Sequence, residues 1–286
     1  MKSPEQQKLT PPAIVARKRG ERLAMMTAYD YPTARLAEEA GVDMILVGDS
    51  LGMVVLGYAS TAPVTMEEML HHGRAVARGA PLTHVTVDLP FMAYQVSDEQ
   101  AVANAGRLVK EGGADSVKLE GGLAMAGRIG AIVRAGIPVV GHIGLLPQTA
   151  AGQGGLKVQG RSIERARAIL ADAEAVATAG AFAMVVEAVP AELGSIITER
   201  APIPTIGIGA GPDCDGQVLV STDVLGLEDR LSPKFAKRYA EVGSIIRDAF
   251  ATYVREVRSG AFPDETHAYA MKPETAEALR RASTEG

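Results

Sequence analysis

The chain has 286 residues, of which 47% are hydrophobic and 22% are charged, a composition typical of a globular protein with a sizeable core. Its net charge of -5 predicts no nucleic-acid partner, and the absence of a run of about 18 apolar residues predicts no membrane span. The only cysteine, Cys214, excludes a disulfide scaffold and suits a reducing compartment, so we expect a cytoplasmic protein. The polar N-terminus has no apolar stretch of the kind found in secretory signals.

Short runs rich in Val, Ile and Met recur along the chain and predict eight strands. Most of these runs are continuously apolar rather than alternating, which is typical of parallel strands that are buried on both faces. The eight runs occupy residues 23–29, 43–50, 84–91, 115–122, 137–144, 182–189, 204–211 and 217–224.

Helical patterns separate most of these runs. They usually begin at a capping residue such as Thr65 or Ser97 and end at glycine. The four clearest patterns cover residues 30–41, 65–79, 97–113 and 162–180. Only "PDCDG" separates the last two strands, which leaves a seventh helix in doubt. Residues 234–260 predict a long amphipathic helix because their apolar positions recur every three to four residues.

Eight strands with intervening helices predict a single α/β domain folded as a (β/α)8 TIM barrel, with an extra C-terminal helix. A doubly wound sheet is the alternative. It is disfavoured by the strand count and by the lack of a Gly-x-Gly-x-x-Gly fingerprint in the first turn. We expect one domain over residues 1–286, with its core at about 20–260 and a polar, loosely held tail at about 261–286.

Ionisable side chains lie at one end of five successive predicted strands. In a parallel barrel these ends meet at one rim, where barrel enzymes place their active sites. Any one of these residues could be a helix cap or half of a local ion pair, but the whole set indicates a site. The set consists of Asp49 with its neighbour Ser50, Asp88, Lys118, Glu120, His142 and Glu187.

Three carboxylates at this rim predict a metal site. Asp49, Asp88 and Glu120 are oxygen donors, which suit a hard cation such as Mg2+ better than zinc. Burying them against the single positive charge of Lys118 requires either a cation or protonation of some of them. We expect one or two direct ligands, with the rest reaching the metal through water.

The other polar residues of the rim have several possible roles. Lys118 could hold a substrate carboxylate, form a Schiff base, or pair with Glu120. Glu187 stands among apolar residues, which suits proton transfer, but it could instead be the partner of a basic residue on a neighbouring loop. His142 could donate to a substrate oxygen or be an ordinary core histidine.

Three further features favour structural roles. The "GIGAG" stretch at 207–211 lies where many barrels bind phosphate, but it equally suits a tight turn and is not a P-loop. His71 and His72 are expected at the surface of a helix. Cys214 has no base at motif spacing, so nothing supports a nucleophilic role.

Several long motifs then resemble one family. They are "MMTAYDYPTARLAEEAGVD", "LVGDSLGMVVLGYASTAPVTMEEM", "VDLPFMAY", "VKLEGG", "PVVGHIGLLPQT" and "VVEAVP". Together they closely resemble the 3-methyl-2-oxobutanoate hydroxymethyltransferases, also called ketopantoate hydroxymethyltransferases. The resemblance covers roughly residues 8 to 260.

The resemblance implies a transferase that moves a one-carbon unit from 5,10-methylenetetrahydrofolate to 3-methyl-2-oxobutanoate, in pantothenate and coenzyme A biosynthesis. It implies one Mg2+ per subunit and a homo-oligomer, typically a homodecamer. By motif, the metal ligands are Asp49, Asp88 and Glu120. The substrate-binding residues are Asp49, Ser50, Asp88, Lys118 and His142, and the catalytic proton acceptor is Glu187.

Two alternatives stay open. A Mg2+-dependent carbon–carbon lyase of the phosphoenolpyruvate mutase or isocitrate lyase kind would act on a similar 2-oxo acid, but it would carry a catalytic cysteine loop, and Cys214 lacks that context. A barrel that only binds a ligand would be expected to have lost some of the rim residues, and all of them are present.

Overall fold

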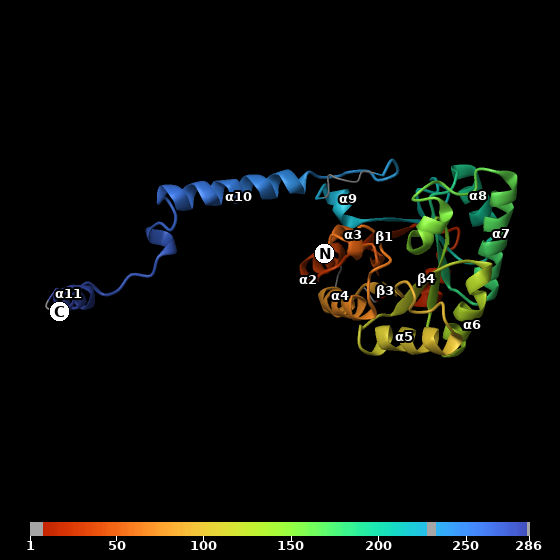
Figure 1. Cartoon of the computed structure of the whole chain (residues 1–286), viewed down its shortest axis with the longest axis horizontal. Coiled ribbons are helices and arrows are strands. Elements are labelled where there is room, and N and C mark those ends of the chain that lie inside the picture. The colour runs from red at the N-terminus through yellow and green to blue at the C-terminus, as the bar shows by residue number, and fades with distance from the viewer. Residues whose placement is uncertain (1–7, 228–232, 285–286) are drawn as a thin grey trace.

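A closed barrel of eight parallel strands forms the centre of the molecule (Figure 1). The computed structural model describes residues 8–227 and 233–284. Each strand pairs with the next one along the chain, and β8 closes the barrel on β1. The strands are β1 (Leu23–Thr27), β2 (Met44–Val47), β3 (His84–Asp88), β4 (Ser116–Glu120), β5 (Val139–Gly144), β6 (Ala183–Glu187), β7 (Thr205–Ile208) and β8 (Gly216–Leu219). The predicted (β/α)8 fold is confirmed.

An outer layer of helices covers the strands, and the capping residues in the sequence set where these helices begin. Thr65 forms a capping box with Glu68, and Ser97 accepts a hydrogen bond from the backbone of Gln100. The main helices are α2 (Tyr31–Glu39), α4 (Met66–Gly79), α5 (Asp98–Lys110), α6 (Ala126–Arg134), α7 (Ile163–Thr178) and α8 (Ala191–Arg200).

Short helical segments occupy several connections. These are α1 (Pro11–Val15), α3 (Leu51–Val54) and α9 (Ser221–Leu225), with 3-10 turns η1 (Leu123–Met125), η2 (Pro147–Gln153) and η3 (Glu265–His267). The link from β7 to β8 contains no helix, as the short "PDCDG" connection suggested.

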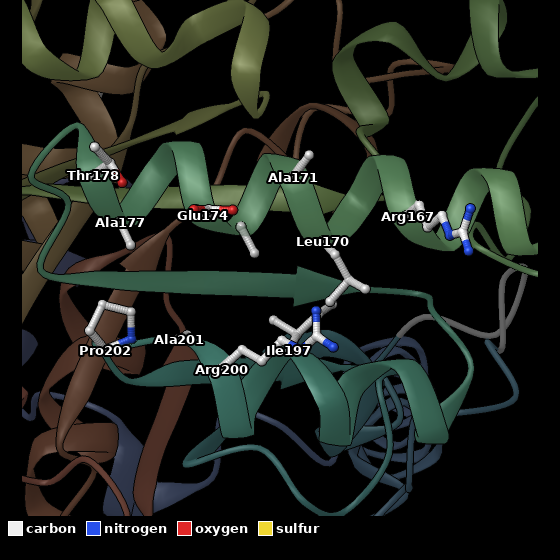
Figure 2. Close-up of a pocket in the computed structure, with 11 residues that line it drawn as sticks. Arg167, Leu170, Ala171, Glu174, Ala177, Thr178, Ile197, Arg200, Ala201 and Pro202 are labelled. Carbon is white, nitrogen blue, oxygen red and sulfur yellow. The ribbon is translucent and has the colours of Figure 1, made fainter.

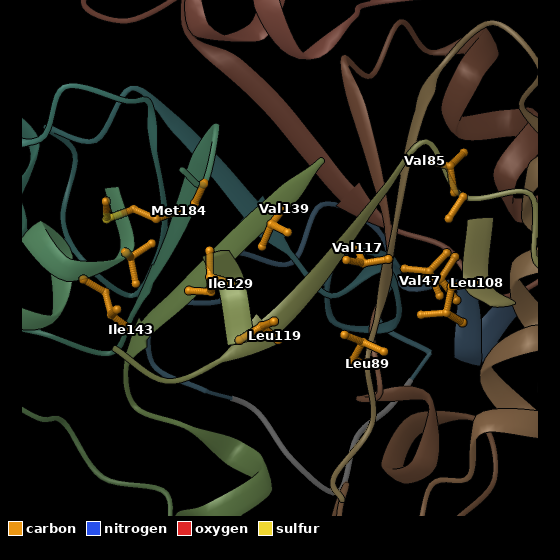
Figure 3. Close-up of a cluster of buried hydrophobic side chains, with 14 of the residues drawn as sticks. Val47, Val85, Leu89, Leu108, Val117, Leu119, Ile129, Val139, Ile143 and Met184 are labelled. Atoms are coloured by element: carbon orange, nitrogen blue, oxygen red, sulfur yellow. The ribbon is translucent and has the colours of Figure 1, made fainter. Parts of the chain in front are cut away.

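The apolar core has two layers, because successive side chains of a strand point to opposite faces. Between strands and helices, Val117 and Leu119 of β4 pack among Leu108, Ile129 and their neighbours (Figure 3). A second cluster fills the inside of the barrel; its members include Leu23, Met25, Met44, Leu46, Val140, Val185, Ile206 and Val218. The alternate residues of β4, Lys118 and Glu120, therefore face the barrel interior.

The predicted helix at 234–260 is wrong in its first eight residues. Helix α10 runs over Val242–Ser259. Before it, the backbone N–H groups of Tyr239 and Ala240 both donate to the carbonyl of Val224 at the end of α9. These tertiary hydrogen bonds hold the segment against α9, so it cannot form the local bonds of a helix.

The C-terminal part leads away from the barrel (Figure 1). No residue of α10 is buried, although its apolar face carries Ile245, Phe250 and Tyr253, each more than half exposed. Helix α11 (Pro273–Ala282) is also without buried residues. Among the described residues, no helix is both long and apolar enough to cross a membrane.

Candidate active site

One cavity at the carboxyl ends of the strands brings the predicted residues together. Its volume is about 490 Å³. The register of the sheet explains this meeting, because Asp88 is paired with Lys118, Glu120 with His142, and Gly144 with Glu187 on neighbouring strands. All seven predicted residues line the cavity: Asp49, Ser50, Asp88, Lys118, Glu120, His142 and Glu187.

Lys118 is the cationic centre of the cavity. Its Nζ lies 3.0 Å from Oδ1 of Asp88 and 3.2 Å from Nδ1 of His142. Burial alone would lower the pKa of this amine, but the charges of Asp88, Glu120 and Asp49 raise it above its usual value. An amine with a raised pKa is a poorer nucleophile, because it is protonated at neutral pH, and this argues against a Schiff base. The observed ion pair joins Lys118 to Asp88, where a pair with Glu120 had been an alternative.

His142 connects Lys118 to Glu187. Because the ammonium of Lys118 can only donate, Nδ1 of His142 accepts, and the imidazole proton belongs on Nε2, 3.0 Å from Oε2 of Glu187. Burial, and then the charge of Lys118, lower the pKa of His142, so the ring is neutral. The structure therefore places His142 against Glu187, where a basic loop residue had been the alternative partner.

The chain turns sharply after Glu187. Ala188 is buried and has a φ of 47°, an unusual left-handed conformation for a residue other than glycine. Its N–H donates to Ile208 and its carbonyl accepts from Gln159, both at 2.8 Å. Such a conformation costs about 1–3 kcal/mol and tends to occur at functional sites.

Asp49 and Glu120 are buried acids that repel their neighbours. Burial, followed by the charge of Asp88, raises the pKa of Asp49 to about 7. Burial and the charge of Asp49 also raise the pKa of Glu120 well above its usual range. The backbone N–H of Asp49 donates to Oδ2 of Asp88 at 3.0 Å, which brings the acids of β2 and β3 together.

Two glycines allow the chain to leave this crowded site. Gly121 follows Glu120 with a φ of 120°, which side-chain-bearing residues rarely adopt. A Cβ atom on Gly122 would lie 2.0 Å from Oδ1 of Asp172, and that same oxygen accepts the N–H of Leu123 at 2.8 Å. The "EGG" sequence therefore provides both a left-handed turn and room for the Asp172 side chain of α7.

The donor set fits a divalent cation. The three buried carboxylates of this cavity face its one buried ammonium, Lys118, and Oδ1 of Asp88 is buried without a well-aligned hydrogen-bond donor. Within the described residues, however, no three His, Cys, Asp or Glu side chains already surround one point closely enough for coordination. Asp49, Asp88 and Glu120 supply the oxygen donors and the excess negative charge that such a cation would offset.

Sequence reasoning missed three neutral residues of the site. Gln148 and Tyr94 are buried beside Asp49 and Glu120, and the hydroxyl of Tyr29 lies 2.9 Å from Oγ of Ser50. Amides and phenols on separate loops leave no pattern in the sequence. Two signals were available: the excess of buried acids, which requires hydrogen-bond donors, and the family motifs, which contain all three residues.

The weaker candidates take structural positions. Gly209 and Gly211 have φ values of 66° and 87°, so the "GIGAG" stretch forms a turn at the cavity edge. Cys214 is buried, and burial raises the pKa of its thiol, which makes it a poor nucleophile. His71 is exposed, whereas Nδ1 of His72 lies 2.5 Å from the carbonyl of Tyr29.

A larger groove lies outside the barrel between α7 and α8 (Figure 2). Its volume is about 720 Å³, and its charged groups, Arg167, Glu174 and Arg200, lie among alanines and Leu170. It has no cluster of buried acids. The chemistry therefore favours the smaller cavity at the rim.

Comparisons with solved structures agree with the barrel fold. Among solved structures, a phosphonopyruvate hydrolase complexed with oxalate and Mg++ has a TM-score of 0.59 at 15% identity, covering 96% of this chain and 99% of the other. A 2,3-dimethylmalate lyase, a PEP mutase/isocitrate lyase superfamily member, also gives 0.59 at 15%, covering 96% and 94%. At such low identity these likenesses show the fold alone.

Sequence comparisons identify the family of the chain. A 3-methyl-2-oxobutanoate hydroxymethyltransferase of Moorella thermoacetica is 59% identical over 93% of this chain and 99% of the relative. Enzymes of the same name from Carboxydothermus hydrogenoformans and Thermus thermophilus are each 58% identical, over 91% and 88% of this chain and 94% and 96% of the relatives. The family model described as ketopantoate hydroxymethyltransferase matches residues 8–265, and the chain belongs to that family of transferases.

Proposed function

We propose that the protein transfers a hydroxymethyl group to 3-methyl-2-oxobutanoate, with 5,10-methylenetetrahydrofolate as one-carbon donor and Mg2+ as cofactor. The product is 2-dehydropantoate (ketopantoate), an intermediate of pantothenate and coenzyme A biosynthesis. The observation that carries the proposal is a single rim cavity in which three buried carboxylates face one buried lysine, in a chain whose relatives bear this name.

The inner part of the cavity suits a small keto acid and one cation per subunit. Asp49 and Asp88 would hold the cation, and Glu120 would complete its site directly or through water. Lys118 supplies a positive charge for the substrate carboxylate, and Ser50 supplies a hydroxyl beside it. When bound, the cation would polarise the keto group and offset the negative charge that develops on its oxygen.

Glu187 is the proposed base. Its side chain is 16% exposed, whereas those of Asp88, Lys118, Glu120 and His142 are at most 4% exposed, so it is open enough to reach a substrate proton. Nε2 of the neutral His142 ring lies 3.0 Å from Oε2 of Glu187. In this role Glu187 removes the proton on the carbon next to the carbonyl, and that carbon then forms a bond to the methylene carbon of the folate. The carbon–nitrogen bonds of that methylene break, water supplies the hydroxyl group, and tetrahydrofolate leaves.

The outer part of the cavity suits a larger co-substrate. Leu156, Val158 and Phe235 line it, and these apolar side chains are between 39% and 58% exposed. Lys157 and Lys234 stand beside them on the same two loops. An apolar wall with two lysines is complementary to a folate, which combines flat aromatic rings with carboxylates.

We also propose a cytoplasmic homodecamer. The exposed apolar face of α10 supports self-association, because contiguous exposed apolar side chains commonly mark protein contacts. The single cysteine, buried and free, supports a reducing compartment. Light scattering coupled to size-exclusion chromatography would test the assembly, and a mass near that of the monomer would contradict it.

The decisive experiment measures ketopantoate formation from 3-methyl-2-oxobutanoate and 5,10-methylenetetrahydrofolate, with Mg2+ and then with EDTA. We expect activity that requires both the folate and the metal. Full activity in EDTA would overturn the metal assignment. Cleavage of a 2-oxo acid derivative without folate would favour the carbon–carbon lyase alternative.

A further inference from the structure

Gln148 contacts the acidic cluster from η2, a 3-10 turn that contains no charged residue. It lies in η2, directly after β5, and is 6% exposed. Its side-chain Nε2 donates to Oδ2 of Asp49 at 2.8 Å, and its backbone N–H donates to Oε2 of Glu120 at 3.0 Å. One neutral residue therefore contacts two carboxylates that come from different strands and repel each other.

The surroundings of Gln148 determine how its amide is oriented. The second hydrogen on Nε2 goes to the carbonyl of Leu89 at 2.9 Å, and Oε1 accepts from the hydroxyl of Tyr94 at 2.7 Å. A flipped amide would place Oε1 against the Leu89 carbonyl and the Asp49 carboxylate, which are both acceptors. The nitrogen must therefore face Asp49.

Tyr94 extends the network behind Gln148. It is 1% exposed, and its hydroxyl accepts the backbone N–H of Glu120 at 3.2 Å. The amide oxygen of Gln148 is thus bonded to Tyr94, while its amide nitrogen is bonded to Asp49. A buried hydrogen-bonded network of this kind restricts the geometry of its members.

We propose that Gln148 is a positioning residue, which holds the carboxylates of Asp49 and Glu120 in the arrangement that binds the divalent cation without itself touching the cation. The inference rests on the metal site of the proposed function. Hydrogen bonds that orient metal ligands typically change metal affinity by about 10- to 100-fold when they are removed.

The test compares Gln148→Met with a matched loss of a buried amide elsewhere. Asn104 of α5 donates its Nδ2 to the carbonyl of Ala93, in the same loop as Tyr94 but with no bond to a carboxylate. Asn104→Leu is therefore the control for simple destabilisation. Electron paramagnetic resonance measures the dissociation constant for Mn2+ without substrate. The melting temperature and the rate of deuterium exchange into the keto acid are measured for the same variants.

We expect Gln148→Met to raise the Mn2+ dissociation constant by about 10-fold or more, whereas Asn104→Leu lowers the melting temperature with little effect on affinity. Tyr94→Phe, which removes only the supporting hydroxyl, should raise the constant by a smaller factor and serves as the test if Gln148→Met does not fold. The proposal is overturned if the folded Gln148→Met variant, or Tyr94→Phe in its place, binds Mn2+ with a dissociation constant within twofold of that of the unaltered protein. If the unaltered protein itself binds no Mn2+, the metal part of the proposed function fails, and the positioning role fails with it.

Discussion

At the amino end of the barrel, buried polar groups have matching partners, whereas at the carboxyl end buried acids outnumber the lysine that faces them. Asp215 accepts from Lys18 at 2.8 Å and from the backbone of Thr205 at 2.9 Å. His84 contacts the hydroxyl of Ser116 at 2.9 Å. These bonds satisfy the groups that they join, which is the mark of a structural role.

The two ends differ in how they shift acid pKa values. Burial would raise the pKa of Asp215, but the bonds from Lys18, Thr205 and Arg19 outweigh it and lower the pKa. For Asp49, burial and then the charge of Asp88 raise the pKa to about 7. The same barrel therefore stabilises its fold with charge at one end and keeps charge available for ligands at the other.

The largest expected effect comes from Glu187→Gln at the carboxyl end. An amide cannot accept the substrate proton, so deuterium exchange into 3-methyl-2-oxobutanoate should slow by about 100- to 10,000-fold. Nuclear magnetic resonance in D2O with Mg2+ measures this exchange. The exposed Glu192→Gln is the control and should exchange normally. Normal exchange in Glu187→Gln would remove Glu187 from the base role.

At the amino end, Asp215→Asn should lower the free energy of unfolding by about 2–4 kcal/mol, because it leaves the ammonium of Lys18 without its counter-charge. Denaturation in guanidinium chloride measures this change. Asp213→Asn, at a neighbouring exposed position, should have almost no effect. Equal stability of the Asp215 and Asp213 variants would show that the amino-end ion pair does not support the fold.

The stability of the amino end should also depend on pH in a defined direction. Because the folded pKa of Asp215 is lower than its ordinary value of 3.8, its contribution is complete above pH 3.8 and is lost as pH falls through the folded pKa. The stability difference between the unaltered protein and Asp215→Asn should therefore shrink below pH 3.8. A difference that stays constant down to pH 2 would contradict the shift.

At the carboxyl end, Asp49→Asn should leave stability unchanged or raise it by up to about 1 kcal/mol, because it removes a buried charge that Asp88 repels. Its amide oxygen can still accept from Gln148. Calorimetry measures the melting temperature, and the transfer assay should show lost activity. Destabilisation as large as that of Asp215→Asn would mean that the two ends do not differ in the way described.

The smallest expected effect belongs to a partly exposed ion pair at the amino end. Lys8 and Asp115 lie 2.7 Å apart, with about a third of each side chain exposed (33% and 28%). Lys8→Met should cost less than about 1 kcal/mol, because solvent screens such pairs. A melting curve at low salt measures this loss of stability. A loss as large as that of Asp215→Asn would show that the more buried ion pair does not contribute more to stability.

The fold and the charged part of the site could be read from the sequence, because both depend on local pattern. Continuous apolar runs identified the strands, and the parallel arrangement then placed Asp49, Asp88, Lys118 and Glu187 at one rim. The neutral partners could not be read in this way. Gln148 reaches Asp49 across 99 positions of the chain, and Tyr94 reaches Glu120 across 26, so no local periodicity connects them.

The sequence by itself determined the barrel and the end of it that carries charge, because strand period, helix caps and strand-end residues are all local properties. Only the tertiary structure decided that Lys118 pairs with Asp88 and that His142 meets Glu187. It also decided that residues 234–241 bond to the end of α9 instead of extending α10. These outcomes depend on distances between strands and loops that are far apart in the sequence. Such distances are fixed only when the hydrogen bonds between strands close the barrel.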